Sequence, residues 1–317
     1  GLIYMSTGGD KAYEIDPGHS TVMFRAKHLG VSYTYGRFND FSGAFTLAEL
    51  LSQVRGVTTL STGFLLAPQV AAWYGNPGGL RLFVDGMEAD AINVRNGGIP
   101  DLASVSLWAL EDVKVERTAG ELRVHLRTWR VDRTTPYTRV DVFTGSENIN
   151  LYRGYFGKRM DNGAVLQFAG QQLSTDSRGG LGGDALGLMT RVGWAGKRFS
   201  VDATLLRQGL NRAAGARFLT TSPQPNALPP FSGSEAIAYL RAAWGDPEGT
   251  GRWAQLIAST LSAGESHASS SSSSPPPNTS TKAASADTTA VRAQYTFSGG
   301  ITRWGVRLST TNRLRSI

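Results

Sequence analysis

Few residues of this 317-residue chain have the types and spacing that catalysis, metal binding or phosphate binding requires. His19 and His28 lie nine positions apart, but no carboxylates or further histidines are spaced with them as in a metal site. Ser20 has no base and orienting acid at the spacing of a nucleophilic triad. The glycine-rich run 178–184 lacks the Gly-Lys-Ser/Thr ending of a phosphate-binding loop, which favours a flexible hairpin tip. We therefore expect no catalytic residue, no metal ligand and no cofactor, and predict that the chain is not an enzyme.

Composition narrows the class of protein. Only 18% of the residues are charged, and the 40% that are hydrophobic form short patches without the ~18-residue apolar run of a spanning helix. The absence of cysteine excludes disulfides and thiolate chemistry. The net charge is +7, but the basic residues do not cluster as they would in a nucleic-acid interface, so we expect no nucleic-acid partner. Arginines instead recur singly at alternate strand positions, as on the polar wall of a barrel: Arg123, Arg127, Arg139, Arg153, Arg292, Arg303 and Arg307.

From residue 121 onward, apolar and polar side chains alternate in short segments separated by turn residues. This pattern is typical of antiparallel strands with one oily and one polar face, and the segment lengths suit the about 9–11 residues of a tilted membrane-spanning strand. The clearest case sets Leu122, Val124 and Leu126 against Arg123, His125 and Arg127. The other segments lie at 139–142, 149–158, 163–173, 187–195, 198–205, 235–244, 252–262, 291–298 and 303–308. We interpret His125 as ordinary solvated barrel wall, with an anion-attracting patch in a lumen as the alternative.

The connections between these segments differ in length. Residues 160–163 and 195–197 are short enough for tight turns. The segments near 211–234 and 263–287 are long and rich in proline or serine, and we predict that they are disordered extracellular loops. Aromatic residues near the strand ends are predicted to form interfacial girdles, with packing in a soluble sandwich as the alternative: Tyr137, Tyr152, Tyr155, Phe156, Trp194, Trp244, Trp253 and Trp304.

The amino segment 11–47 has the pattern of short antiparallel strands with glycine turns. Its motifs are Tyr-x-Ile-Asp-Pro-x-His-Ser from residue 13, Phe-x-x-x-His-Leu-Gly from residue 24, and Gly-x-Phe-x-x-Phe-x-Gly from residue 36. These motifs resemble the opening of the YceI-like, polyisoprenoid-binding family and cover about the first quarter of its domain. The resemblance implies a lipocalin-like barrel around an apolar cavity, with Phe24, Phe38 and Phe41 as candidate lipid-binding residues.

Three further motifs follow in order. Residues 48–57 begin as a short amphipathic helix and end at a glycine turn, and residues 79–86 end in Val-Asp-Gly, which favours a turn of the primed type. Residues 107–116 pass from a short helix into a strand, with Val113 and Val115 on one side and Lys114 and Glu116 on the other. These motifs resemble the plug of TonB-dependent outer-membrane receptors in order and spacing. The resemblance implies these plug-motif residues: Val84, Asp85, Gly86, Glu111, Val113, Val115 and Glu116.

These patterns predict an all-β fold. We expect an incomplete antiparallel transmembrane β-barrel, a small mixed α+β plug-like segment and an amino-terminal lipocalin-like strand fragment. The YceI-like fragment is placed at residues 1–47, the plug-like segment at 48–120 and the partial barrel at 121–317. Residues 1–20 lack a signal-peptide pattern and the strand pattern runs to Ile317, so we expect that one or both ends of a longer product are missing.

The predicted function is that of an outer-membrane receptor for uptake or passage of an unidentified small ligand. The resemblance implies location in the cell outer membrane, contact with outer-membrane lipid, and a TonB-type energy-coupling protein as a partner. The alternative is a periplasmic YceI-like protein that binds a polyisoprenoid lipid through its amino segment. A structural or adhesive surface barrel without transport is a third hypothesis.

Overall fold

The computed structural model describes eleven stretches of the chain, which form two compact units. Unit 1 comprises residues 1–63 and 68–130, and unit 2 comprises residues 64–67 and 131–317. Within the described stretches, no helix is long and apolar enough to cross a membrane. The described residues are 22–28, 32–38, 46–61, 66–89, 99–144, 149–175, 182–213, 230–245, 251–268, 285–301 and 306–316.

Unit 1 is built on a mixed six-stranded sheet with the order β2-β1-β7-β8-β5-β6. β7 and β8 form an antiparallel pair, whereas β8 runs parallel to β5 and β1 runs parallel to β7. A separate two-stranded sheet joins β3 to β4. The elements of this unit are β1 (Val22–His28), β2 (Ser32–Phe38), α1 (Leu47–Ser52), β3 (Val57–Ser61), β4 (Gln69–Trp73), η1 (Pro77–Gly79), β5 (Leu80–Val84), β6 (Met87–Glu88), η3 (Leu102–Ser104), η4 (Leu107–Ala109), β7 (Leu110–Arg117) and β8 (Leu122–Thr128).

The predicted amphipathic helix is present as α1, and its start has a local cause. Thr46 accepts a hydrogen bond from the backbone N–H of Glu49 through its hydroxyl, and the Glu49 carboxylate accepts one from the backbone N–H of Thr46. Such a capping box satisfies two N–H groups that the first turn leaves unpaired, and replacing such a cap costs about 1 kcal/mol. Leu47 and Leu51 are fully buried, the helix ends at Ser52, and Gly56 in the following turn has a positive φ of 89°.

One strand that the sequence assigned to the barrel belongs to unit 1. β8 contains Leu122, Val124 and Leu126, which are all buried, but it pairs with β7 and β5 rather than with the strands that follow it. Its alternation arises because one face covers the core of unit 1. The prediction that His125 forms barrel wall was therefore wrong. The ring of His125 stacks on Phe83 with 4.9 Å between the ring centroids.

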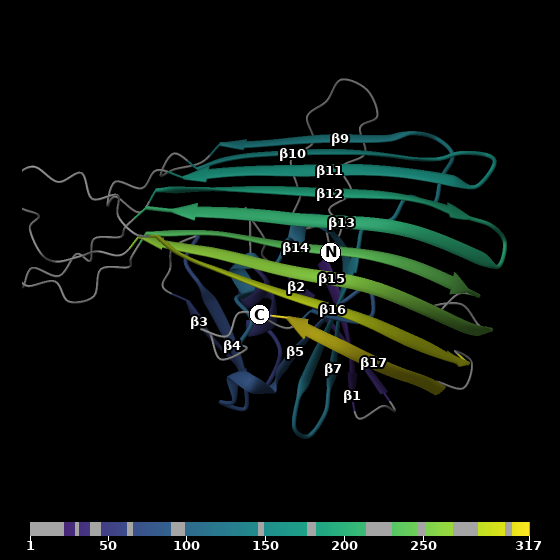
Figure 1. Ribbon diagram of the computed structural model, residues 1–317. Helices are drawn as coiled ribbons and strands as arrows, with labels where there is room; N and C mark the ends of the chain where they lie inside the picture. The colour runs from purple at the N-terminus through teal and green to yellow at the C-terminus, as the bar shows by residue number, and fades with distance from the viewer. Residues whose placement is uncertain are drawn as a thin grey trace, which may run out of the picture. The chain divides into compact units, whose positions relative to one another are not determined.

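Unit 2 is a nine-stranded antiparallel sheet in which every strand pairs with its neighbour in the sequence. Figure 1 shows these strands side by side in one layer, from β9 in teal to β17 in yellow. β9 and β17 form the two edges, so the described part of the sheet is open. The strands are β9 (Tyr137–Thr144), β10 (Asn150–Arg159), β11 (Ala164–Thr175), β12 (Gly183–Ala195), β13 (Phe199–Arg212), β14 (Phe231–Trp244), β15 (Arg252–Ala268), β16 (Ser285–Ile301) and β17 (Val306–Ser316). The predicted all-β class with a large antiparallel sheet is confirmed.

The predicted tight turns are present, but the predicted long loops are too long at both ends. The N–H of Gly163 donates to the carbonyl of Met160, and the N–H of Gly196 donates to the carbonyl of Phe199. β13 and β14 extend into the segment predicted as a loop at 211–234, and β15 and β16 extend into the one at 263–287. The polar residues at these ends pair in register, as in Asn211 with Ser232. An antiparallel ladder provides hydrogen-bond partners for the backbone N–H and C=O groups of any residue type. Residues 214–229 and 269–284 lie outside the described part of the chain.

In the nine-stranded sheet the exposed face is apolar and the covered face carries polar side chains. In a soluble protein the arrangement is the reverse. Large apolar side chains are exposed on one face, which we call the outer face. The other, inner face carries buried polar side chains among a similar number of buried apolar ones. The exposed set includes Val140, Val142, Leu166, Phe168, Leu186, Leu188, Val192, Val201, Leu205, Leu240, Leu256, Tyr295 and Phe297. The buried polar set includes Gln167, Arg191, Asp202, Thr204, Gln255, Ser259, Arg292, Gln294, Thr296 and Ser298.

Candidate functional site

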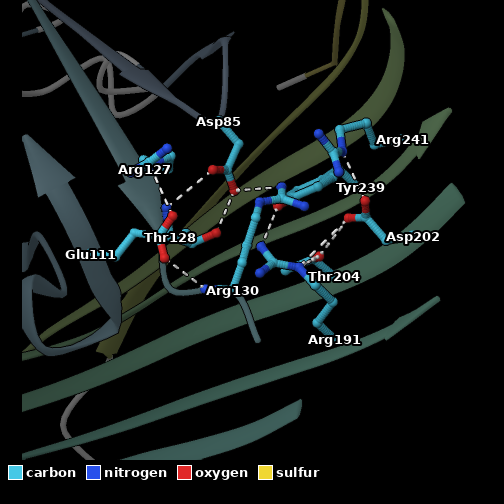
Figure 2. Close-up of polar contacts among 10 residues, drawn as sticks. All are labelled: Asp85, Glu111, Arg127, Thr128, Arg130, Arg191, Asp202, Thr204, Tyr239 and Arg241. Carbon is cyan, nitrogen blue, oxygen red and sulfur yellow. Dashed lines mark hydrogen bonds and ion pairs between the residues drawn. The ribbon is translucent and has the colours of Figure 1, made fainter. Parts of the chain in front are cut away.

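The inner face of unit 2 carries a buried network of five polar side chains across β12, β13 and β14, which we call the Asp202 network (Figure 2). Cross-strand register places Arg191 opposite Thr204, Thr204 opposite Tyr239, and Asp202 opposite Arg241. All five side chains therefore point to the same side of the sheet, because positions paired across a strand share a face.

Asp202 is the only carboxylate of this network and contacts two guanidinium groups. Its Oδ2 accepts a hydrogen bond from Nε of Arg241 at 2.8 Å, and its Oδ1 lies 3.6 Å from Nε of Arg191. Arg191 also donates to Oγ1 of Thr204 at 2.9 Å and to the hydroxyl of Tyr239 at 2.9 Å. The network therefore holds one more positive than negative charge. Because Arg191 is only 2% exposed, its charge depends on these partners for compensation.

Positive charge also predominates over the rest of the inner face. Arg153 donates to Oε1 of Gln171 at 2.7 Å, and Arg139 pairs with Asp141 at 2.7 Å. By strand register, the inward positions with described side chains hold twice as many arginines as carboxylates. The arginines are Arg139, Arg153, Arg159, Arg191, Arg212, Arg241, Arg292 and Arg313, and the carboxylates are Asp141, Asp202, Glu235 and Glu265. Such a surface attracts small anions.

A second polar network lies within unit 1 and contains two of the predicted plug-motif residues, Asp85 and Glu111 (Figure 2). Oδ1 of Asp85 accepts a hydrogen bond from the N–H of Thr128 at 3.1 Å, and its Oδ2 accepts one from the Thr128 hydroxyl at 2.5 Å. Glu111 accepts a hydrogen bond from the N–H of Arg130 at 3.0 Å and pairs with Arg127 at 2.8 Å. Both carboxylates thus hold the chain segment 127–130, at the carboxyl end of unit 1.

The geometry of the Val-Asp-Gly turn explains its composition. Asp85 has a φ of 50° and Gly86 a φ of 92°, so both central residues are left-handed, as the predicted primed turn requires. The turn joins β5 to β6, with Val84 opposite Met87. Asparagine, aspartate and glycine tolerate this conformation best, and here the Asp85 carboxylate is also needed to reach Thr128.

Burial raises the pKa of Glu111 above its ordinary value of 4.5. The positive charge of Arg127 and the hydrogen bond from the N–H of Arg130 oppose this effect without cancelling it. The charged form of Glu111 is therefore less favourable in the folded protein than in the unfolded chain, although it has a close ion-pair partner.

The other plug-motif residues lie either in the core of unit 1 or on the opposite face of its sheet. Val84, Val113 and Val115 are buried, in agreement with the predicted alternation along β7. Glu116 lies on the opposite face, where its Oε2 is 3.4 Å from Nε2 of His125. Within the described residues, no group of three or more His, Asp or Glu side chains could hold a metal ion.

Two of the three candidate lipid-binding residues lie in the strands β1 and β2 of unit 1. Phe24 lies in β1 opposite Gly36, and Phe38 lies in β2 opposite Val22. Phe41 lies outside the described part of the chain. β1 and β2 extend the sheet of unit 1 through the parallel β1–β7 pair.

The aromatic residues predicted to form interfacial girdles are divided between the two faces of the nine-stranded sheet. Four of the aromatic residues point outward and are at least 37% exposed: Tyr152, Phe156, Trp194 and Trp244. Phe199, which the prediction omitted, lies opposite Trp244 at the same end of the sheet. Tyr137, Tyr155 and Trp253 lie on the inner face by register, so their assignment to the girdle was wrong. Trp304 lies outside the described residues.

Arg191 and Tyr239 were not singled out from the sequence. Both follow the strand alternation, but their hydroxyl and guanidinium groups meet only because three strands hold positions 48 residues apart side by side. The sequence feature that could have predicted the contact of Arg191 with Thr204 is the turn at 195–197, because this turn sets the register between β12 and β13.

Comparison with known sequences gives short matches, and the family match lies in the amino segment. Residues 13–63 match the YceI-like domain family, a range that spans the predicted YceI-like fragment and the start of the predicted plug-like segment. A UPF0312 protein of Pseudomonas paraeruginosa is 56% identical over 39 residues, which are 12% of this chain and 20% of that protein. A UPF0312 protein of Pectobacterium carotovorum is 61% identical over 31 residues, or 10% of this chain and 16% of that protein. The chain thus spans about a fifth of these relatives.

Comparison with solved structures concerns most of the chain. The FrpB iron transporter of Neisseria meningitidis is similar with a TM-score of 0.60 and 12% identity, over 81% of this chain and 42% of that one. The copper transporter OprC gives a TM-score of 0.53 and 13% identity, over 81% and 41%. The siderophore receptor PirA of Acinetobacter baumannii gives 0.51 and 14%, over 81% and 46%. At these identities the likeness concerns the fold, and this chain spans less than half the length of each of the three.

Proposed function

We propose that this chain belongs to an outer-membrane receptor of the TonB-dependent class and forms part of the path of a small ligand across the outer membrane. The observation that carries the proposal is the polarity of the nine-stranded sheet. Its exposed face is apolar and its inner face is polar and cationic. A soluble sheet buries its apolar face, whereas a transmembrane β-barrel turns its apolar face toward lipid and its polar face toward the lumen.

The height of the apolar band supports this proposal. On β12 the outward positions from Leu186 to Val192 carry no charge, between Asp184 at one end and Trp194 at the other. Ten residues of strand span about 33 Å. With a strand tilt of about 40°, this corresponds to about 25 Å across the membrane, which is the height of the apolar band of outer-membrane barrels.

Trp194, Trp244 and Phe199 fit the interfacial level of such a band. They lie at the end of the sheet where the tight turn at 195–197 joins β12 to β13. Amphipathic rings favour the headgroup region, and Nε1 of Trp194 donates to the carbonyl of Asn162 in the adjacent turn.

We infer that the ligand is small and anionic. The support is the excess of arginine on the inner face, around the Asp202 network in particular. The three similar structures are described as an iron transporter, a copper transporter and a siderophore receptor. A metal bound by an organic chelator with net negative charge would suit such a surface. In this proposal the further partners are outer-membrane lipid and a TonB-type energy-coupling protein.

The plug role of unit 1 is part of the same proposal. The resemblance of residues 48–116 to the plug motifs supports it, as does the way in which Asp85 and Glu111 hold segment 127–130. The alternative is lipid binding by the amino segment, for which the YceI-like match at residues 13–63 is the support. That alternative requires a closed cavity, whereas β1 and β2 extend the sheet of unit 1.

Single cysteines can test the polarity of the sheet, because the natural chain has none. The full chain would be reconstituted into phosphatidylcholine vesicles with a nitroxide label at one site: Leu256→Cys, Gln255→Cys or Lys197→Cys. Leu256 points outward, the adjacent Gln255 points inward and is buried, and Lys197 is exposed in a turn.

We expect the Leu256 label to be accessible to oxygen but protected from a water-soluble nickel chelate, since oxygen concentrates in lipid. The Lys197 label should be accessible to the chelate, and the Gln255 label should be less accessible to oxygen than the Leu256 label. The proposal is refuted if the Leu256 label is as accessible to the nickel chelate as the Lys197 label, because the apolar face would then lie in water.

A further inference from the structure

Arg207 is a cation on the apolar outer face. Among the described outward side chains of β12, β13, β14 and β16, Arg207 is the one positively charged residue. It lies opposite Leu188 on β12 and Ala236 on β14, and it is exposed. It makes no hydrogen bond or ion pair to any residue that the structure describes. Asp184, an outward carboxylate on β12, receives a hydrogen bond from Asn211 instead.

A hollow of about 720 Å³ lies on the outer face, and Arg207 is the next outward residue on β13 beyond its lining residue Leu205. It forms where small side chains on successive strands, Ala203, Ala238 and Ala258, leave space between larger ones such as Leu205 and Leu240. Register places Leu205 opposite Ala238, and Leu240 opposite both Ala203 and Ala258. The depression therefore crosses several strands.

Arg207 and the hollow lie close enough together for one amphiphilic ligand to contact both. Arg207 is two residues beyond Leu205, which is about 7 Å along the strand. Arg207 lies opposite Leu188, within the apolar band, and pairs with no residue that the structure describes. Such an arginine on a lipid-facing surface needs an anion, which it reaches by extending its side chain toward the headgroup level. A guanidinium group matches phosphate oxygens in geometry as well as in charge. The volume of the hollow lies within the range of small-molecule sites.

We propose that Arg207 and this hollow bind one phosphate-bearing membrane lipid. The lipid phosphate accepts hydrogen bonds from the Arg207 guanidinium, and an acyl chain lies in the hollow against the alanines. This inference rests on the proposed function, because the outer face must contact a membrane. It adds a lipid site on the outside of the sheet, separate from the ligand path on its inner face.

The test measures lipid binding to the full chain in detergent micelles by native mass spectrometry. The probes are dioleoylphosphatidylglycerol, dioleoylglycerol with the same chains but no phosphate, and inorganic phosphate. The variants are Arg207→Gln, Ala238→Trp to fill the hollow, and Arg252→Gln as a matched control. Arg252 also points outward and is exposed, but it lies at the opposite end of the sheet, where β15 begins.

We expect the phosphatidylglycerol to bind the natural chain about tenfold more tightly than the diacylglycerol, since only the former has the phosphate. Arg207→Gln should abolish that preference. Ala238→Trp should weaken both lipids, and Arg252→Gln should leave both unchanged. Each variant is compared by its melting temperature from circular dichroism, and Arg207→Lys should retain part of the preference if the fold is intact.

Three results would overturn the inference. The first is unchanged phosphatidylglycerol binding in Arg207→Gln, and the second is an equal loss in Arg252→Gln, which would indicate general attraction to charge. The third is full displacement of the lipid by millimolar inorganic phosphate, which would indicate a simple anion site. If the Leu256 label faces lipid while these results occur, the proposed function stands and only the lipid site fails. If the label faces water, the proposed function itself fails.

Discussion

Removal of the Asp85 carboxylate should destabilise unit 1 more than removal of any half-exposed acid in the same unit. Asp85 accepts two hydrogen bonds from Thr128, whose residue surface is fully buried. Asp85→Ala leaves a buried N–H and a buried hydroxyl without their acceptor, and hydrogen bonds to a charged group are worth about 1.5–3 kcal/mol each. Alanine also tolerates the φ of 50° poorly, at a cost of about 1 kcal/mol.

These terms are not additive, so we expect a total loss of about 3–5 kcal/mol for Asp85→Ala. Asp85→Gly should lose about 1 kcal/mol less, because glycine adopts a positive φ without strain. Asp85→Asn should lose about 1–2 kcal/mol, because its carbonyl oxygen still accepts from one Thr128 donor. Asp112→Asn is the control, since that carboxylate is 31% exposed and pairs with Lys114 at 3.4 Å, an arrangement worth at most about 1 kcal/mol.

Hydrogen–deuterium exchange of the detergent-solubilised full chain measures this loss locally. Each 1.4 kcal/mol corresponds to about a tenfold change in the opening equilibrium. Peptides that cover β5 and β8 should therefore exchange about a hundredfold or more faster in Asp85→Ala, and about tenfold or less faster in Asp112→Asn. Peptides from unit 2 report whether the rest of the chain is intact. If Asp85→Ala exchanged no faster than Asp112→Asn, the Asp85–Thr128 contact would not hold the end of β8, and our account of the turn would be wrong.

Further predictions concern the two networks and the amino segment. Because the pKa of Glu111 is raised, folded unit 1 binds more protons at this site than the unfolded chain, so its stability falls as pH rises from 4.5 to the raised pKa. Glu111→Gln should lack this decline in exchange-derived stability over that window, and equal pH profiles would contradict the pKa direction. Asp202→Asn should lower the thermal stability of the sheet in micelles by about 3–5 kcal/mol, since buried Arg191 loses its counter-charge, whereas an unchanged melting profile would show that Arg191 is compensated elsewhere. Phe24→Asp and Phe38→Asp should leave binding of a fluorescent isoprenoid probe to the full chain unchanged, and loss of tight, saturable binding in either variant would favour the YceI-like lipid-binding alternative.

Several local features of unit 1 could be predicted because they depend on neighbours in the sequence. The turn at Asp85-Gly86 follows from the few residues that tolerate positive φ, and the side assigned to Val113 and Val115 follows from the pleat of a single strand. The start of α1 could also have been predicted from Thr46 and Glu49, which form a capping box three residues apart.

The errors concern interactions between distant parts of the chain. β8 alternates apolar and polar residues as a barrel strand does, and this pattern does not indicate the strands with which β8 pairs. The ends of the predicted loops were wrong because asparagine, serine, glycine and glutamate at 211, 232 and 264–266 do not favour strands by composition, yet the backbone ladder continues through them. Trp253 was placed in the girdle from its position near a strand end, but the register of β15 turns it inward.

The sequence by itself determined the all-β class and the outward or inward direction of most side chains in the nine-stranded sheet. Those properties depend on a period of two residues, which every strand carries locally. The tertiary structure decided which sheet each strand joins and which inward side chains meet. Arg191, Asp202 and Tyr239 form one network only because the turns set the register of three strands. Ala203, Ala238 and Ala258 gather into one hollow for the same reason, since cross-strand neighbours are chosen by pairing and not by distance along the chain.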